Sequence, residues 1–325
     1  MDGVTLQFLK RLLRKSRVLR ASLLLCLLLM SSVSQARILL LLSSDVSYYQ
    51  ETAKSVQVTA SNLGIPNSDF DLLTTKEAKN KQIFLKSYEL IVSIGTSAAS
   101  EALQQESKTP LLSIFTPKNA VDSFLLTKEH VQHRKISAIY LDQPLHRLIA
   151  LAHLLKPEAK KFGTIFGPIS QIVQPEVEQL MRKNNLSLKY GILTQDDNPV
   201  TILKPVVTNS ELFLAIPDHA ILNRAVAKWI LYLGFQNKIP VIGFSKAYTN
   251  AGALASVYSS PENVGQQAGE LIAAWLTRND QSIWNPQYPH YYTLSTNPSV
   301  ARSLGISLPT ESELYLKFQQ KEAIK

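Results

Sequence analysis

The 325-residue sequence has a single cysteine, Cys26, which lies in an apolar run near the start of the chain. A disulfide needs two cysteines and a thiolate zinc centre needs several, so the sequence excludes both within one chain. Leu25 precedes Cys26 where a bacterial lipoprotein signal has a small residue. We therefore expect a mature chain without cysteine and without a cysteine nucleophile.

Glycine is also scarce, with 12 residues in the chain and neither a G-x-G-x-x-G nor a Walker spacing among them. This absence argues against the glycine-rich loops that bind nucleotide phosphates. The segment Gly95–Ala99 lacks the second glycine that a nucleophile elbow needs two residues after its serine. We expect no cofactor and no enzymatic activity. A hydrolase, the alternative, would need a histidine within hydrogen-bond reach of Ser97 or Ser170.

No apolar run approaches the ~20 residues that span a bilayer, and Ala21–Met30 has about half that length. Six Lys and Arg residues precede this run, and the segment "SSVSQA" follows it. Such a pattern is typical of a secretory signal peptide, residues 1–36, cleaved after Ala36. We expect export to the periplasm, with an uncleaved amino-terminal anchor as the alternative.

The formal net charge of +9 depends partly on this segment, because the chain after Ala36 has 28 basic and 24 acidic residues, a net charge of +4. No basic helix or aromatic-interleaved basic patch remains, so we expect no nucleic-acid partner. With 45% hydrophobic and 18% charged residues, the composition is that of a globular protein long enough for two lobes.

From Arg37 onward, short apolar runs alternate with segments of helical periodicity, as in "RILLLLSSD" and "YELIVSIGTSAASEAL". Runs that are apolar on both sides predict strands covered on both faces, and the alternation predicts an α/β class with parallel sheets. The charged loop 116–135 separates a first strand–helix series from a second and favours two lobes.

In open α/β sheets, ligands bind beyond the carboxyl ends of the strands. These ends carry hydroxyl, carboxylate and amide side chains, and we predict one polar cleft lined by Ser43, Ser44, Asp45, Thr96, Ser97, Thr116, Ser170, Gln171, Asp218 and Tyr248. The hydroxyls near Ser43 and Thr96 would bind an anionic group of the ligand, and Asp218 a cationic one. Ordinary turn and capping chemistry is the alternative.

Aromatic residues at or just after strand ends are candidates for holding an apolar part of the ligand: Tyr48, Tyr49, Phe115, Tyr248 and Tyr258. Packing between lobes explains each of them equally well. His130 and His133 are spaced for one helical face, but they lie among charged residues, so we expect a solvated connection and no metal site.

Several segments resemble, in order, the substrate-binding proteins of ABC transporters, in particular the tryptophan- and tyrosine-type binders. They include "KTPLLSIFTP", "LLKPEAKKFGTIFGP", "SELFLAIPDHAI" and, most specifically, Ile239–Leu276 with "IPVIGFS", "AGALASV" and "VGQQAGE". The resemblance implies a type I periplasmic-binding fold, two Rossmann-like lobes joined by three crossings of the chain. It places lobe 1 at 37–140 plus about 261–283, lobe 2 at 141–260 plus about 284–300, and a carboxyl-terminal tail at 301–325.

By the same resemblance, Thr96, Ser97, Thr116 and Asp218 match ligand-contacting positions, and Ser170 and Gln171 match approximately. The implied function is capture of a small polar solute, an amino acid or similar carboxylate, by a monomer that delivers it to an ABC permease. A stand-alone sensor or accessory protein of the same fold is the alternative. Thr116–Asn119 departs from the Asp-Pro pair usual in the family, so ligand identity does not transfer.

Overall fold

The computed structural model describes residues 38–82 and 85–323. The expected secretory signal, residues 1–36, lies outside this part of the chain. Within the described residues, no helix combines the length and the apolar character that a membrane span requires.

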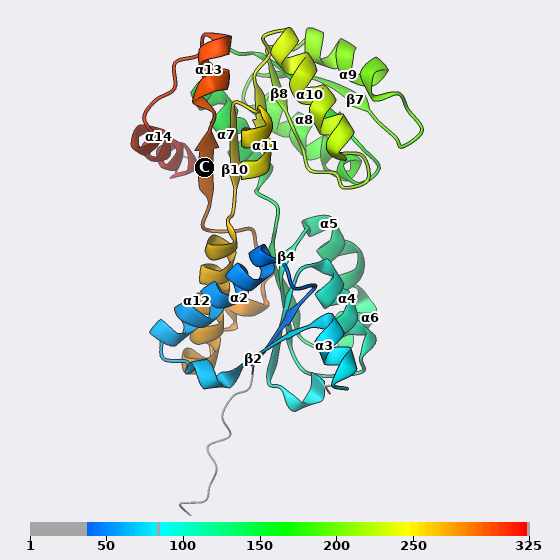
Figure 1. Cartoon of the computed structure of the whole chain (residues 1–325), viewed down its shortest axis with the longest axis vertical. Helices are drawn as coiled ribbons and strands as arrows, with labels where there is room; N and C mark the ends of the chain where they lie inside the picture. Colours follow the sequence, from blue (N-terminus) through cyan, green and yellow to red (C-terminus); the bar gives the residue numbers. More distant parts are fainter. Residues whose placement is uncertain (1–37, 83–84, 324–325) are drawn as a thin grey trace, which may run out of the picture. The chain divides into compact units, whose positions relative to one another are not determined.

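Strands and helices alternate along both halves of the chain (Figure 1). The first half contains β1 (Ile38–Leu42), α2 (Ser47–Asn62), η1 (Asn67–Asp69), β2 (Phe70–Thr74), α3 (Thr75–Asn80), η2 (Leu85–Ser87), β3 (Leu90–Ile94), α4 (Thr96–Gln104), β4 (Leu111–Thr116), α5 (Lys118–Ala120), the π-helical turn η3 (Val121–Leu125), α6 (Lys128–His133) and β5 (Ile136–Tyr140). The second half contains α7 (Leu145–Leu155), β6 (Lys161–Phe166), η4 (Ser170–Val173), α8 (Gln174–Lys183), β7 (Ser187–Ile192), α9 (Pro199–Thr208), β8 (Leu212–Leu214), α10 (Arg224–Gln236), β9 (Val241–Gly243), α11 (Lys246–Ala251), β10 (Ala255–Tyr258), α12 (Pro261–Arg278), η5 (Gln281–Trp284), β11 (Thr293–Thr296), α13 (Pro298–Leu304) and α14 (Glu311–Ala323).

The first sheet, the centre of lobe 1, has the strand order β2-β1-β3-β4-β5, and all its strands are parallel. Its central strands are buried on both faces, which explains their continuous apolar sequence. Leu40 and Leu42 of β1 pack against α2 and α12, whereas Leu39 and Leu41 pack against α3 and α4.

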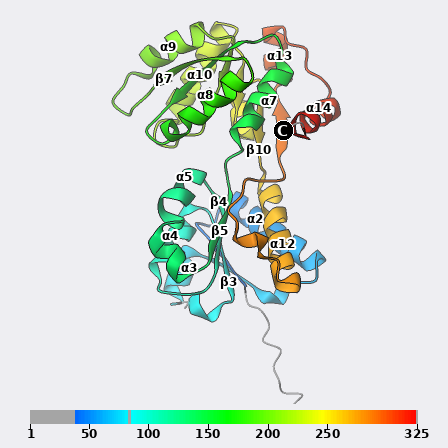
Figure 2. The ribbon, with the colours of Figure 1, turned by 180° about the vertical axis from the view of Figure 1, so that it is seen from behind.

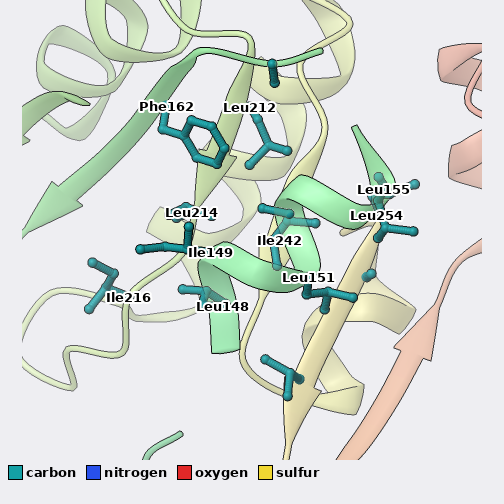
Figure 3. Close-up of a cluster of buried hydrophobic side chains, with 14 of the residues drawn as sticks. Leu148, Ile149, Leu151, Leu155, Phe162, Leu212, Leu214, Ile216, Ile242 and Leu254 are labelled. Carbon is teal, nitrogen blue, oxygen red and sulfur yellow. The ribbon is translucent and has the colours of Figure 1, made fainter. Parts of the chain in front are cut away.

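The second sheet, the centre of lobe 2, has the order β11-β10-β9-β8-β6-β7, with β11 antiparallel to β10 and the other strands parallel. Helix α7 lies across one face, where Leu148, Leu151 and Leu155 meet side chains of β8 and β9 (Figure 3). Helices α9 and α10 cover the opposite face. The predicted α/β class with two parallel-stranded lobes is therefore confirmed, with β11 as the antiparallel exception.

Within the described residues the chain passes between the sheets at 141–144, 259–260 and 288–292. After the second crossing, α12 returns to pack beside α2 (Figure 1 and Figure 2). The chain then remains with the first sheet as far as Gln287, whose N–H donates to the Ala138 carbonyl at 2.9 Å. The segment expected to be a tail contains α14, whose Leu314 and Phe318 are buried in the core of lobe 2.

The close packing of α12 on α2 depends on glycine. A Cβ added at Gly265 would lie 2.5 Å from the Thr52 carbonyl oxygen and 2.5 Å from Ser55 Cβ.

We expect Gly265→Ala to lower the free energy of unfolding by about 2 kcal/mol, since overpacking outweighs the ~1 kcal/mol by which alanine favours a helix interior. Urea unfolding measures this difference. Arg278→Ala, at the exposed end of the same helix, is the control, and a Gly265→Ala protein as stable as wild type would contradict the packing described.

Candidate functional site

A cavity of about 450 Å³ lies at the carboxyl ends of strands from both sheets. Its walls come from segments that follow β4, β5, β6, β8, β9 and β10. The lining residues are Phe115, Pro117, Asn119, Leu141, Asp142, Gln143, Ile169, Pro217, Asp218, His219, Leu222, Phe244, Ser245, Tyr258 and Ser259. This is the edge at which ligands bind in open parallel sheets, and the volume suits a small molecule.

Three of the residues that line the pocket are aromatic: Phe115, Phe244 and Tyr258. Phe115 has a φ of +59° at a register shift in the pairing of β4 with β5. A left-handed backbone is costly for a residue with a bulky side chain, and such strain concentrates at functional sites. The Phe115 ring stacks on Tyr48 with centroids 5.7 Å apart and meets the edge of Tyr49 at 5.8 Å. These contacts hold the strained residue at the pocket.

Asp142, which follows β5, is the carboxylate best suited to a ligand. It accepts a hydrogen bond from the backbone N–H of Lys118 at 2.6 Å. Burial raises the pKa of the Asp142 carboxyl, and the hydrogen bond from the Lys118 N–H opposes this shift only in part. A desolvated carboxylate gains from a cationic partner. The pocket therefore presents an acceptor for an ammonium group.

The second carboxylate of the lining, Asp218, accepts four hydrogen bonds from residues of lobe 2. Its Oδ2 accepts hydrogen bonds from Ile169 N at 3.1 Å, Ser170 N at 2.8 Å and Ser170 Oγ at 2.8 Å, and its Oδ1 accepts one from Ala220 N at 3.0 Å. Only 3% of the residue's surface is exposed. These contacts fix the loops after β6 and β8, and they leave Asp218 little capacity for the ligand ammonium that the sequence suggested.

Several predicted site residues connect elements of the fold instead of lining the cavity. Ser43 Oγ donates to the Ile94 carbonyl at 3.0 Å and accepts from Ala98 N at 2.9 Å, which ties β1 to the start of α4. Thr116 is fully buried, and its hydroxyl lies 2.9 Å from that of Ser113.

The remaining predicted residues lie at other places. Ser44, Ser97 and Gln171 are exposed, and Asp45 accepts a hydrogen bond from Gln50. Thr96 lines a separate shallow groove on lobe 1 together with Ser100, Leu103, Gln104, Phe124 and His130. Tyr248 is buried against Phe244, and its hydroxyl has no hydrogen-bond partner among the described residues. One of the ten predicted site residues, Asp218, lines the pocket.

The most informative polar residues of the pocket, Asp142 and Gln143, were missed from the sequence. They stand in "KISAIYLDQP", directly after the fifth strand, so the rule that identified the other strand ends also applies to them. Among the described residues, no group of three or more His, Cys, Asp and Glu side chains could hold a metal ion.

Comparison with known proteins agrees with this architecture. The family model described as ABC transporter substrate binding protein matches residues 54–318. The chain belongs to this family. Family and fold are those of substrate-binding proteins, which are not enzymes.

The individual proteins that this chain resembles share little sequence identity with it. A tyrosine-binding protein of Clostridioides difficile (strain R20291) is 24% identical over 209 residues, which cover 63% of this chain and 59% of that protein. The ligand-free, open structure of a Clostridium difficile substrate-binding protein with adhesive properties has a TM-score of 0.67 at 17% identity, over 85% of this chain and 96% of that one. An ABC domain from Streptococcus pneumonia in complex with L-Trp has a TM-score of 0.57 at 16% identity, over 87% and 98% of the two chains.

We expect Asp218→Ala to destabilise the protein because it leaves buried N–H groups of lobe 2 without an acceptor. The loss should be about 3 kcal/mol in the free energy of unfolding, measured by urea denaturation. Asp196→Ala, at an exposed carboxylate of the same lobe, should change it by less than about 0.5 kcal/mol. A stable Asp218→Ala variant that lost only ligand affinity would restore Asp218 as a direct ligand contact.

Proposed function

We propose that this protein captures an amino acid in the cavity at the strand ends and delivers it to an ABC-type permease. The observation that carries the proposal is the combination of an apolar aromatic wall with a desolvated carboxylate, Asp142. An α-amino acid with an apolar or aromatic side chain supplies the matching groups. The names of two relatives, one a tyrosine-binding protein and one in complex with L-Trp, support the same chemical class.

Each part of such a ligand has a partner in the lining. Asp142 would accept hydrogen bonds from the ammonium group. Asn119, Ser245 and His219 offer hydrogen-bond donors for the carboxylate. Phe115, Phe244 and Tyr258 would bury the side chain, because rings offer a large apolar area with defined stacking geometry.

Transport would depend on closure of the two lobes on the ligand. Segments of lobe 1, of lobe 2 and of the crossings all line the cavity, so ligand contacts favour the arrangement that brings them together. A monomer exported to the periplasm by its amino-terminal signal, and recognised there by a membrane permease, fits the family. The alternative is a sensor or accessory protein that binds the same ligand without a permease.

The role of Asp142 is tested by titrating the purified chain, from Arg37 onward, with amino acids and with their deaminated analogues. We expect saturable binding of one or a few amino acids and none of the corresponding deaminated acids. Asp142→Asn should weaken binding about 30-fold, or ~2 kcal/mol, because the ligand ammonium loses its charged partner. The amide oxygen that this substitution introduces can still accept from the Lys118 N–H, so the ligand-free variant should be as stable as wild type.

Asp196→Asn is the matched control for this substitution and should bind like wild type. Equal affinity of wild type and Asp142→Asn would remove Asp142 from the site. Equal binding of amino acids and deaminated acids would contradict recognition of an ammonium group. Saturable binding of another chemical class would replace the proposed substrate.

The raised pKa of Asp142 also predicts how affinity depends on pH. The ammonium group binds the ionised carboxylate, so protons compete with the ligand. Affinity should be constant near neutral pH and should fall as pH is lowered through the raised pKa, starting above the ordinary aspartate pKa of about 4. Calorimetric titrations between pH 8 and pH 4 measure this dependence, and Asp142→Asn should lack this loss of affinity at acid pH. The same acid limb in both proteins would assign it to another group.

A further inference from the structure

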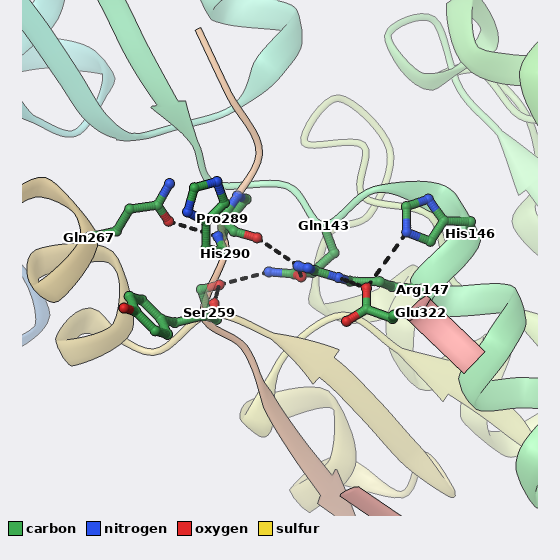
Figure 4. Close-up of polar contacts among 9 residues, drawn as sticks. Gln143, His146, Arg147, Ser259, Gln267, Pro289, His290 and Glu322 are labelled. Atoms are coloured by element: carbon green, nitrogen blue, oxygen red, sulfur yellow. Dashed lines mark hydrogen bonds and ion pairs between the residues drawn. The ribbon is translucent and has the colours of Figure 1, made fainter. Parts of the chain in front are cut away.

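The three crossings of the chain are hydrogen-bonded to one another through side chains that line the pocket (Figure 4). Gln143 Nε2, from the first crossing, donates to Ser259 Oγ of the second at 2.8 Å. Ser259 Oγ in turn donates to the Tyr291 carbonyl of the third. Because Gln143 and Ser259 both line the cavity, any movement of the crossings changes the pocket wall.

Arg147 of α7 fixes the orientation of Gln143. Its Nη1 donates to Gln143 Oε1 at 2.8 Å and to the Pro289 carbonyl at 2.7 Å. With its oxygen held by Arg147, the Gln143 amide can only direct its NH₂ group toward Ser259. Arg147 is 9% exposed, so these bonds form in a shielded environment in which hydrogen bonds from a cation are strong.

Glu322 of the carboxyl-terminal helix holds Arg147 in turn. The Glu322 carboxylate accepts from Arg147 Nε as an ion pair, and the guanidinium group lies 4.6 Å from the centre of the Tyr292 ring. Tyr292 contacts Phe318 of α14 with ring centroids 5.1 Å apart. Phe318 is fully buried, so α14 is a fixed part of lobe 2 from which Glu322 reaches the crossings.

The third crossing is also held from lobe 1. Gln267 of α12 is 1% exposed, and its Oε1 accepts from His290 N at 2.7 Å. Its Nε2 donates to Gln287 Oε1 at 3.2 Å. The crossing at 288–292 is therefore fixed by α12 at one side and, through Arg147, by α14 at the other.

We infer that Glu322 is a positioning residue for ligand binding, which acts through Arg147 to fix Gln143, Ser259 and the crossings without touching the ligand. The effect on affinity rests on the function proposed above, whereas the effect on the crossings does not. The carboxyl-terminal helix thus belongs to the binding apparatus as well as to the core of lobe 2.

Hydrogen–deuterium exchange of the ligand-free chain from Arg37 onward tests the effect on the crossings. Glu322→Ala should speed exchange about 10-fold in peptides covering 141–147 and 288–292, with the central strands of both sheets unchanged. Glu322→Gln keeps an oxygen acceptor for Arg147 Nε and should restore most of the protection. Glu311→Ala removes an exposed carboxylate from the same helix and should have no effect.

An uncompensated Arg147 charge could unfold the Glu322→Ala chain, so the double variant Arg147→Met/Glu322→Leu is measured beside it. Replacing both partners by apolar residues of similar size preserves packing and leaves no buried charge. Faster exchange confined to the crossings is expected in the double variant too. Exchange that is unchanged there, or that rises equally throughout the chain, would reduce Glu322 to a structural residue and overturn the inference.

The effect on binding is measured with L-tyrosine and L-tryptophan as probes. We expect affinity about 10-fold lower in Glu322→Ala and in the double variant, and unchanged in Glu311→Ala. Unchanged affinity despite faster exchange at the crossings would overturn the link between positioning and binding. If the wild-type chain binds neither probe, that result counts against the proposed function, and the exchange data still decide whether Glu322 fixes the crossings.

Discussion

Two parallel strands of one sheet need a crossover that returns the chain from the carboxyl end of one strand to the amino end of the next. This constraint determines where the pocket lies. All five strands of the first sheet and all but β11 of the second are parallel. Their carboxyl ends therefore collect at one edge of each sheet, where six strands contribute to the cavity. The buried strands consist mainly of apolar side chains, and the side chains just beyond the strand ends form the pocket wall.

The two carboxylates of the pocket illustrate how similar positions acquire different roles. Asp218 and Asp142 both follow strands and both line the cavity. Four hydrogen bonds from its own lobe satisfy Asp218, which makes it a residue that holds loops together. Asp142 accepts one backbone hydrogen bond from Lys118, and burial raises its pKa. The carboxylate with unused acceptor capacity is the one that gains by binding a cation.

Much of the fold could be predicted from the sequence, because apolar runs such as Leu90–Ile94 followed by helical periodicity are local signals. The edge that carries the pocket was predictable for the same reason. The roles of the polar residues at the strand ends were not predictable, because they depend on contacts between distant segments: Ser43 bonds to a helix start 55 residues away, and Asp218 to Ser170, 48 residues away. Phe115 and Tyr258, which the sequence marked as aromatic candidates at strand ends, do line the pocket, but the positive φ of Phe115 was not predictable from the sequence.

The proposed function places an amino acid at the carboxyl ends of the strands, with its ammonium group on Asp142. The most direct measurement is a crystal structure of the chain grown with the amino acid that binds most tightly. We expect ligand density among Phe115, Phe244 and Tyr258, with the ligand nitrogen within hydrogen-bond distance of the Asp142 carboxylate. Ligand density in the groove beside Thr96, or a ligand nitrogen held by Asp218 with Asp142 left without contact, would contradict it.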